Sequence, residues 1–413
     1  MKLTNWIGEH GTALGTLDLD APLDDLEPLR EVVGDARVVA LGESTHHVRE
    51  FYQVRHRMLR FLVERCGFEV YALEAPFTQG HALEAWVAGG PGTVEEAAKE
   101  GVALGLGECQ EMYDVLTWMR IYREKAGITC VGVDLPGSCG SLLPALDHVA
   151  GYLRGACPEA LPALETAAEL AARFHDPVTL VAMSRYPSLE PAERDRLTGA
   201  LSTLMAWMNR LAFVAAGREH ETALWHLRGA WYLDQLHRAT AEGFAAASTF
   251  RDVYLAESVL RLLDGGARVV LAAHNWHIQR AVTPEGLLPA GAHLAAALGD
   301  GYRAIGLTSS LGRTTAMGEP TPERPHGAWL DAPLPPPVAG SVESAFSTGP
   351  LWTLADLRAA APHVEDADAY RHTRMADYFL DLPVFAAFDA FACVSRSTGT
   401  GYVTGSPPPS QPV

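Results

Sequence analysis

The sequence predicts an α/β fold, with a mainly parallel sheet flanked by helices and a large helical insertion. Short apolar runs rich in Val, Ile and Ala recur along the chain, and each ends in a polar residue, as buried parallel strands do. Helical patterns separate these runs, and the strand signal disappears between about residues 141 and 247, where Ala, Leu, Glu and Arg dominate. The predicted strands are 37–42, 69–74, 128–134, 268–274 and 302–308.

Apolar positions at helical spacing predict the helices that connect these strands. The expected helices are 46–66, 79–88 and 109–125 in the first part, 190–213 and 219–242 in the insertion, and 352–360 near the end, where 388–394 is a further strand. Prolines between 320 and 337 indicate a semi-rigid connection rather than an element. The expected organisation is 1–140 as the N-terminal part of the α/β core, 141–247 as the helical insertion, 248–318 as the second part of the core, 319–345 as the proline-rich connection, 346–399 as the C-terminal α/β part and 400–413 as a disordered tail.

Composition is that of an ordinary soluble protein, with 413 residues of which 48% are hydrophobic and 20% charged. Acidic residues outnumber basic ones by 50 to 32, and the formal net charge of −18 opposes binding to nucleic acid or anionic lipid. The first residues do not resemble a secretory signal, and no apolar run reaches membrane-spanning length, so we expect a cytoplasmic protein. Six scattered cysteines without a CxxC pair fit neither a disulfide framework nor a thiolate zinc site. The oligomeric state stays open.

Ionisable side chains stand at the carboxyl ends of four predicted strands. They are Glu43, Glu74, Asp134 and His274. Strands buried on both faces are expected to be apolar, so charged groups at their ends either face a solvated cleft or need partners. Open α/β sheets keep their binding sites at this edge, and we therefore expect the site there.

The segment GESTHHVREF carries the first part of this expected site. Glu43 and His46 are three residues apart and can face one cavity, whereas His47 should point elsewhere and pack. The alternative is that Ser44 or Thr45 only caps the following helix. Arg55 lies about two and a half helical turns after His46 and can hold a carboxylate or a substrate oxygen, or form a structural ion pair.

Glu74 and a histidine pair supply the second part. In the apolar segment VYALEAPF the pKa of Glu74 should be raised unless a cation such as His46 or Arg55 lies nearby. His274 and His277 follow a strand three residues apart and can converge on a metal, a developing oxyanion or a transferred proton. Asn275 can add a donor, and Trp276 is expected to pack against the helical region.

Other motifs give weaker indications of function. Arg251, Asp252 and Glu257 in FRDVYLAESV are expected to form a structural ion-pair network. There is no GxSxG elbow, and the glycine-rich segment 103–108 follows no strand and has no P-loop lysine. Serine-hydrolase chemistry of the usual kind and nucleotide binding therefore lack support.

These motifs together resemble those of the erythromycin esterase family. The matching segments are LGESTHHVREF with Arg55 downstream, LEAPF, AAHNWHI, FRDVYLAESV, GSVESAF and YFLDLPVFAAFDAFACV, which extend to about residue 395. The resemblance implies an α/β core with a helical insertion, a deep cleft and hydrolysis of macrolide lactone esters. By matching position, the implied site residues are Glu43, His46, Arg55, Glu74, His274 and His277. The chain departs from the commoner pattern at His47, where Gly often stands, and at Trp276, where a small residue is usual; both bear on pocket shape and substrate.

The mechanism we expect is ester or lactone hydrolysis without a covalent enzyme intermediate and without a cofactor or metal. His46 would be the general base on water, with Glu43 and Glu74 fixing its tautomer. His274 and His277 would polarise the carbonyl or protonate the leaving alkoxide, and Arg55 would orient the carboxylates or the substrate. Three alternatives use the same residues: acyl transfer or cyclisation in natural-product biosynthesis, hydrolysis by a divalent metal bound to these side chains, and a binding module without catalysis.

Overall fold

The computed structural model describes residues 1–403 apart from 177, 245–246, 284–285 and 320–326, and it confirms the α/β class. A nine-stranded sheet has the order β1-β8-β11-β6-β2-β5-β3-β4, with β7 paired to β6, and β9 and β10 form a separate hairpin. The strands are β1 (Thr12–Leu14), β2 (Val38–Leu41), β3 (Val70–Pro76), β4 (Thr129–Asp134), β5 (Val269–Ala272), β6 (Tyr302–Met317), β7 (Trp329–Pro333), β8 (Trp352–Asp356), β9 (His372–Met375), β10 (Tyr378–Asp381) and β11 (Ala390–Ser397). Neighbours from β11 to β4 are all parallel, whereas β1, β7 and β8 pair antiparallel.

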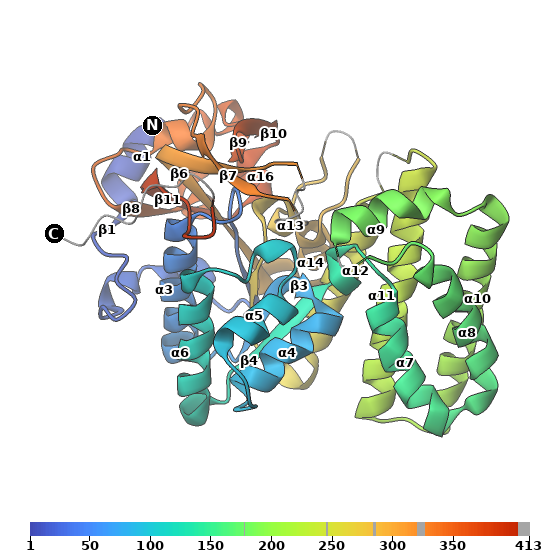
Figure 1. Ribbon diagram of the computed structural model, residues 1–413. Helices are drawn as coiled ribbons and strands as arrows, with labels where there is room; N and C mark the ends of the chain where they lie inside the picture. Colours follow the sequence, from blue (N-terminus) through green and yellow to red (C-terminus); the bar gives the residue numbers. More distant parts are fainter. Residues whose placement is uncertain (177, 245–246, 284–285, 320–326, 404–413) are drawn as a thin grey trace.

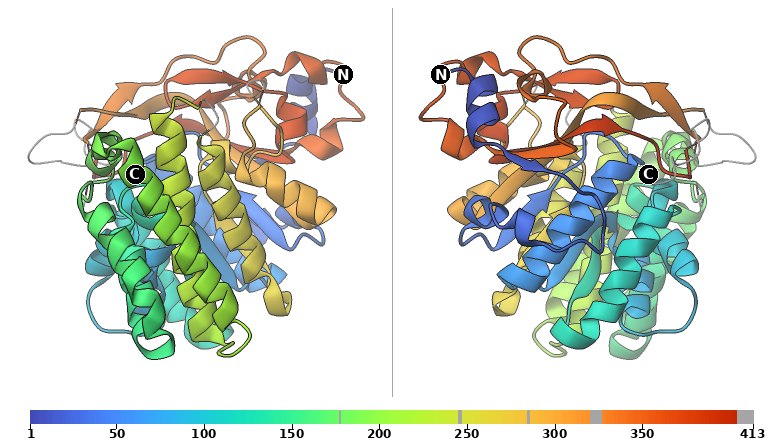
Figure 2. Two further views of the ribbon diagram at one scale, coloured as in Figure 1. Left: turned by 90° about the vertical axis from the view of Figure 1, so that its right-hand side faces the viewer. Right: turned by 90° about the vertical axis from the view of Figure 1, so that its left-hand side faces the viewer.

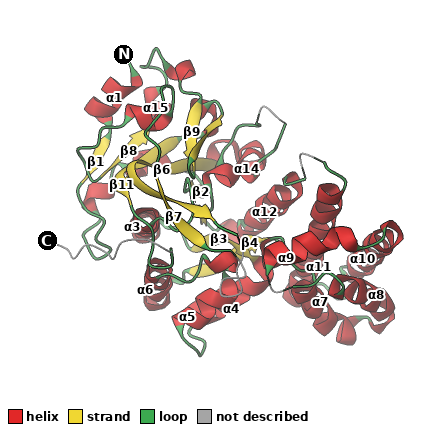
Figure 3. Ribbon diagram, turned by 45° about the horizontal axis from the view of Figure 1, so that its top comes forward, coloured by secondary structure: helices red, strands yellow, loops and turns green. Residues whose placement is uncertain are grey.

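Helices cover both faces of the sheet and build a separate group beside it (Figures 1 and 3). They are α1 (Leu3–His10), α2 (Leu29–Val33), α3 (Arg49–Cys66), α4 (Phe77–Val87), α5 (Val94–Gly101), α6 (Gln110–Ala126), α7 (Leu143–Ala156), α8 (Leu161–Ala172), α9 (Thr179–Arg185), α10 (Pro191–Leu211), α11 (Arg218–Ala241), α12 (Thr249–Leu262), α13 (Asn275–Ile278), α14 (Ala290–Leu298), α15 (Leu357–Ala360) and α16 (Val384–Ala387). None of the helices described is long and apolar enough to cross a membrane.

Successive side chains of the central strands point to opposite faces of the sheet, and apolar side chains cover both faces. In β2, Val39 and Leu41 belong to the apolar cluster under α3 and α6, whereas Val38 and Ala40 belong to the cluster under α12 and α14. Helices α7 to α11 enclose a third apolar cluster of their own. The segments after residue 300, orange to red in Figure 2, gather at one end of the molecule. That end lies over the carboxyl ends of the parallel strands.

Several predicted elements differ from the structure. The helix expected from residue 46 begins at Arg49, which leaves residues 42–48 as a loop. The helix expected at 352–360 is strand β8 followed by the single turn α15, because β8 pairs on one side with β1 and on the other with β11. Sheet pairing outweighs local helix preference there.

Two segments expected to lack structure are partly ordered. The proline-rich connection contains β7, which pairs with the end of β6 and reaches its first proline only at Pro333. At the start of the expected tail, Thr400 is fully buried and Val403 is 5% exposed. The rest of the tail, 404–413, lies outside the described residues. The first residues of the tail therefore belong to the fold.

Candidate active site

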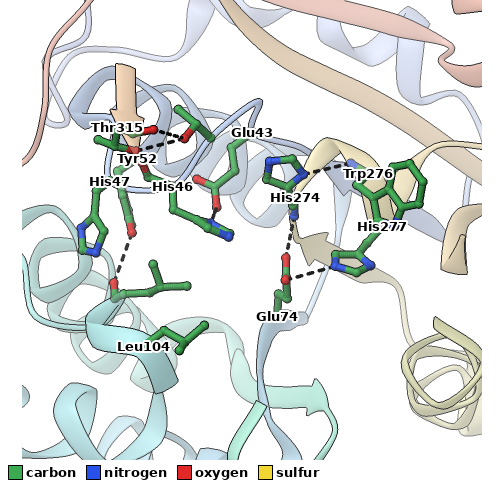
Figure 4. Close-up of polar contacts among 12 residues, drawn as sticks. Glu43, His46, His47, Tyr52, Glu74, Leu104, His274, Trp276, His277 and Thr315 are labelled. Atoms are coloured by element: carbon green, nitrogen blue, oxygen red, sulfur yellow. Dashed lines mark hydrogen bonds and ion pairs between the residues drawn. The ribbon is translucent and has the colours of Figure 1, made fainter. Parts of the chain in front are cut away.

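A cleft of about 880 Å³ opens at the carboxyl ends of β2, β5 and β3. His46, Glu74, His274 and His277 lie on its wall, and the β6–β7 strands and the β9–β10 hairpin supply the opposite rim. Figure 4 shows that these side chains come from different segments and turn toward one space. The position is the one expected from parallel sheet geometry.

A close crossing of two loops brings the ends of β2 and β5 together. The Asn275 amide exchanges two hydrogen bonds with the backbone of Leu307 in β6, at 2.9 and 3.1 Å, and the Asn275 backbone N–H donates to the Glu43 carbonyl at 2.8 Å. A Cβ on Gly42 would lie 1.9 Å from Asn275 Oδ1, so only glycine fits there. Asn275 is therefore a structural bridge and does not donate into the cleft.

Glu43 is a buried carboxylate between a histidine and an arginine. Its Oε1 lies 2.8 Å from His46 Nδ1, and its Oε2 accepts from Arg55 Nη2 at 2.8 Å. Burial alone would raise the pKa of Glu43, but the charge of Arg55 and the bond to His46 hold it below its ordinary value. Glu43 is therefore ionised at neutral pH.

The ionised Glu43 determines which nitrogen of His46 carries the proton. A carboxylate only accepts hydrogen bonds, so Nδ1–H of His46 donates to Glu43, and Nε2 is the nitrogen left to accept a proton. The His46 side chain is 19% exposed and lines the cleft. Its ring and the Trp329 ring meet edge-on, with their centroids 5.5 Å apart. His46 thus offers an accessible proton acceptor.

His274 has the opposite arrangement. Its Nδ1 accepts from the Trp276 backbone N–H at 3.1 Å, so the proton of the neutral ring sits on Nε2. Burial and the nearby His46 lower the pKa of His274 to about 4, which keeps the ring neutral at pH 7. The two rings stand 5.3 Å apart, centroid to centroid, so a proton acceptor and a proton donor face the same space.

Glu74 is fixed by three donors. Its Oε2 accepts from the His274 backbone N–H at 2.7 Å, and its Oε1 lies 2.8 Å from Arg251 Nη2 and 3.4 Å from His277 Nε2. Burial would raise its pKa, but His277 and Arg251 lower it well below the ordinary value. The expected cations, His46 and Arg55, are therefore not the direct partners of Glu74, and Glu74 does not bond His46.

His277 lies between two carboxylates. Its Nδ1 is 2.7 Å from Asp252 Oδ1, and its Nε2 faces Glu74. Burial would lower its pKa, but Asp252 and Glu74 raise it to about 10. The ring is an imidazolium at neutral pH, and its two nitrogens face the carboxylates of Asp252 and Glu74, which it stabilises.

The loop that carries His46 is held from two sides. Thr45 Oγ1 lies 3.0 Å from Thr315 Oγ1, which donates in turn to the His46 carbonyl at 2.6 Å. His47 has a left-handed backbone (φ 57°), is fully buried, and bonds Thr400 Oγ1 at 3.1 Å. Packing of His47 agrees with expectation, but helix capping by Ser44 or Thr45 does not occur, since the N-cap is Val48.

Comparison with known proteins identifies the family. The model of the family described as "Erythromycin esterase" matches residues 63–404. The chain belongs to the erythromycin esterase family. It is accordingly a hydrolase of carboxylic esters. The match begins after Glu43, His46 and Arg55, so the geometry of those three rests on the structure itself.

Individual relatives agree with the family assignment. An Escherichia coli protein named erythromycin esterase type II is 32% identical over 367 residues, which cover 84% of this chain and 86% of that protein. Erythromycin esterase type I of Escherichia coli is 24% identical, covering 91% and 94%. A solved mutant of the erythromycin esterase EreC, in an open conformation, is 23% identical with a TM-score of 0.80 and covers 95% and 99%. At that identity it shows a shared fold.

The candidate site also contains residues that the sequence reasoning assigned elsewhere. Arg251 bridges Glu74 and Asp134 at 2.8 Å each, and Asp252 bonds His277, whereas Glu257 pairs with Arg228 away from them. Arg251 and Asp252 are therefore not part of a common network with Glu257. The available signal was the FRDVYLAESV segment itself, in which an arginine and an aspartate adjoin at the start of a helix.

Trp276 also differs from expectation, because it lies on the wall of the esterase cleft beside His274. Among the described residues, no three His, Cys, Asp or Glu side chains are arranged to hold a metal ion. The carboxylates that would supply oxygen ligands are already bonded to Arg55 and Arg251.

Proposed function

We propose that this esterase hydrolyses a macrolide lactone or a comparable large ester, with His46 as general base on water and no covalent enzyme intermediate. The observation that carries the proposal is the pairing of two imidazoles whose hydrogen bonds leave opposite functions on the nitrogens that face each other. His46 Nε2 accepts a proton, and His274 Nε2–H donates a hydrogen bond, on either side of one space.

The base is oriented by its bond to Glu43. As His46 takes the proton of water, it becomes an imidazolium, which the ionised Glu43 stabilises at 2.8 Å. Arg55 holds Glu43 in its charged form. None of the hydrogen bonds described for His46 goes to a serine or cysteine, which supports direct attack by water rather than by an enzyme nucleophile.

The electrophilic side is assigned to His274. Its Nε2–H would bond the carbonyl oxygen and stabilise the negative charge that develops there when water attacks. Glu74 accepts from the backbone N–H of His274 and so fixes this ring at the strand end. His277, Asp252 and Arg251 are positioning residues that keep Glu74 charged and in place.

Size and lining of the cleft support a large, partly apolar substrate. Its 880 Å³ lies at the upper end of the range of small-molecule sites. Trp276, Met317, Trp329 and Tyr378 contribute apolar surface around the histidines. The curated relatives are named for erythromycin, and a macrolide is the substrate to test first.

The experiment is turnover of erythromycin and simpler esters by the wild type and a His46→Asn variant in ¹⁸O-labelled water. Loss of the base should lower kcat by about 10²–10⁴-fold, while circular dichroism stays unchanged. His363→Asn, at an exposed position away from the cleft, should keep full activity. One labelled oxygen in the product acid indicates hydrolysis.

Near-normal turnover by His46→Asn would overturn the role of this residue. A product ester or amide without label would instead support acyl transfer to a second nucleophile. Activity that chelation removes and a metal restores, with metal found by elemental analysis, would support the metal-dependent alternative.

A further inference from the structure

One charged side chain on the wall of the catalytic cleft has no counter-ion. Asp377 lies in the turn between β9 and β10, is exposed, and lines the cleft together with its neighbours Ala376 and Tyr378. Among the described residues that line the cleft, Asp377 is the only charged side chain without an ion pair, and no described side chain bonds its carboxylate. No step of the hydrolysis described above uses it.

The other charged groups of the cleft have partners within the protein. Glu74 is paired with Arg251 at 2.8 Å and with His277 at 3.4 Å, and Arg251 is paired with Asp134 as well. His274 is neutral at pH 7, because burial lowers its pKa to about 4. A ligand in the cleft therefore meets one uncompensated charge, and that charge is negative.

The turn that carries Asp377 is fixed against the catalytic loop. The Ala376 backbone N–H donates to the Ser44 carbonyl at 2.8 Å. Ala376 has a left-handed backbone (φ 52°), which a non-glycine residue adopts only where the surrounding contacts hold it. Within β9, the Arg374 backbone N–H donates to the buried carboxylate of Glu343 at 2.9 Å. Asp377 therefore has a defined position relative to the reacting groups, which favours recognition of a ligand.

Aromatic rings share the cleft with this carboxylate. Tyr378 follows Asp377 directly and is 50% exposed, and Trp276 and Trp329 also line the cleft. The faces of Trp and Tyr rings attract cations, and such rings recognise quaternary ammonium groups. The formal net charge of −18 attracts cations over a longer range. An unpaired carboxylate beside exposed aromatic surface thus matches an organic ammonium ion.

We propose that Asp377 is a specificity-determining residue, which selects esters that carry a protonated amine or a quaternary ammonium group. This selectivity rests on the proposed esterase function and adds the charge of the substrate to it. The ester carbonyl would lie between His46 and His274, and the ammonium group would extend toward the β9–β10 turn. Since Asp377 does not touch the reacting atoms, it should bind substrate and transition state alike and act on KM more than on kcat.

The test compares pairs of esters of equal length, one with a trimethylammonium group and the other with a tert-butyl group in its place, over several chain lengths. The wild type should have the higher kcat/KM for the cationic ester at the length that reaches the turn. Asp377→Asn should lower this preference about two- to fivefold, mainly through KM. Added salt should lower it as well, because exposed charges are screened. Asp381→Asn removes an exposed carboxylate of β10 that does not line the cleft, and it should keep the wild-type preference.

Two kinetic outcomes would overturn the role of Asp377 while the turnover itself supports the esterase function. They are an equal preference in the wild type and Asp377→Asn, and a wild type that favours the cationic ester at no length. If neither ester is turned over, the proposed hydrolysis fails, and calorimetry with the ether analogues, which cannot be hydrolysed, tests the recognition separately. Weaker binding of the cationic ether by Asp377→Asn than by the wild type would support it, whereas equal affinity would overturn it.

Discussion

His274 and His277 have opposite charge states at neutral pH, and their surroundings explain the difference. His274 is buried with a second imidazole nearby, its Nδ1 accepts from a backbone N–H, and its pKa falls to about 4. His277, three residues on, lies between Asp252 and Glu74, and its pKa rises to about 10. Each ring is thereby suited to a different task, one as a neutral donor and the other as a fixed cation.

Removing Arg55 should shift the pH dependence of catalysis. In Arg55→Met the buried Glu43 loses the cation that lowers its pKa, so it protonates at higher pH and ceases to hold His46. We expect the acid limb of the kcat/KM profile to move to higher pH. Arg65→Met, an exposed change on the same helix α3, is the matched control and should leave the profile in place. Identical profiles in both variants would contradict the role of Arg55.

Removing Asp252 should change how stability depends on pH. The pKa of His277 is about 10 when folded and about 6.5 when unfolded, so its stabilisation is complete below pH 6.5 and is lost as the pH rises toward 10. Asp252→Asn breaks a buried pair and should lower the free energy of unfolding at pH 7 by about 3–5 kcal/mol. Urea unfolding at several pH values should also show a smaller fall between pH 7 and 10 than in the wild type. Asp264→Asn, exposed just after α12, should reproduce the wild-type curve.

Sequence reasoning expected six side chains at one site but could not supply their pairing. That Glu43, Glu74 and His274 end neighbouring strands follows from the alternation of strands and helices. That Glu74 pairs with Arg251 does not, because 177 positions separate them and the partner comes from a helix after the insertion. Long-range pairs of this kind depend on packing that a local pattern does not encode.

At the scale of elements, parallel strands were easier to predict than the edges of the sheet. Strands β2 and β5 are buried along their whole length and appear as continuous apolar runs. Strands β7 and β8 belong to the antiparallel edges, where prolines or a mixed pattern hide the pairing. Residues 352–356 form a strand because they pair with β11.

The close contact between Gly42 and Asn275 can be tested by a substitution at Gly42. In Gly42→Ala the new Cβ would meet the Asn275 side chain, which must then release Leu307 or displace the strand end. We expect a loss of about 1–3 kcal/mol in the free energy of unfolding and a reduced kcat, since Asn275 adjoins His274. Gly8→Ala, where a Cβ meets nothing within 4 Å in helix α1, should be neutral or stabilising. Equal unfolding midpoints for both variants would contradict the crossing.

At the scale of the whole molecule, α12 connects the two apolar regions. Tyr254 belongs to the cluster of the helical insertion, whereas Leu255 and Val259 belong to the cluster beneath the sheet. The same helix begins with Arg251 and Asp252, which fix Glu74 and His277. Displacement of the insertion relative to the sheet is therefore transmitted to the positions of the site residues.

Thr400, near the end of the described residues, is hydrogen-bonded to His47 in the loop that carries His46. A substitution at this distant position should therefore affect catalysis. Thr400→Val keeps the shape of the side chain but removes the hydroxyl bonded to His47. We expect kcat to fall several-fold, with a loss of about 1–3 kcal/mol in the free energy of unfolding. Thr203→Val, which removes an exposed hydroxyl in α10, should change neither. Unchanged kinetics in the Thr400 variant would show that the loop holds its shape without this bond.

This contact joins two segments that the ribosome makes at widely separated times. Thr400 is added to the chain 353 positions after His47, and Val48 forms its bridge with Gly399. At about 5–20 residues per second, a ribosome needs about 20 to 70 seconds to cover that interval. The residues of the His46 loop therefore exist for that interval without the segment that contacts them in the folded protein.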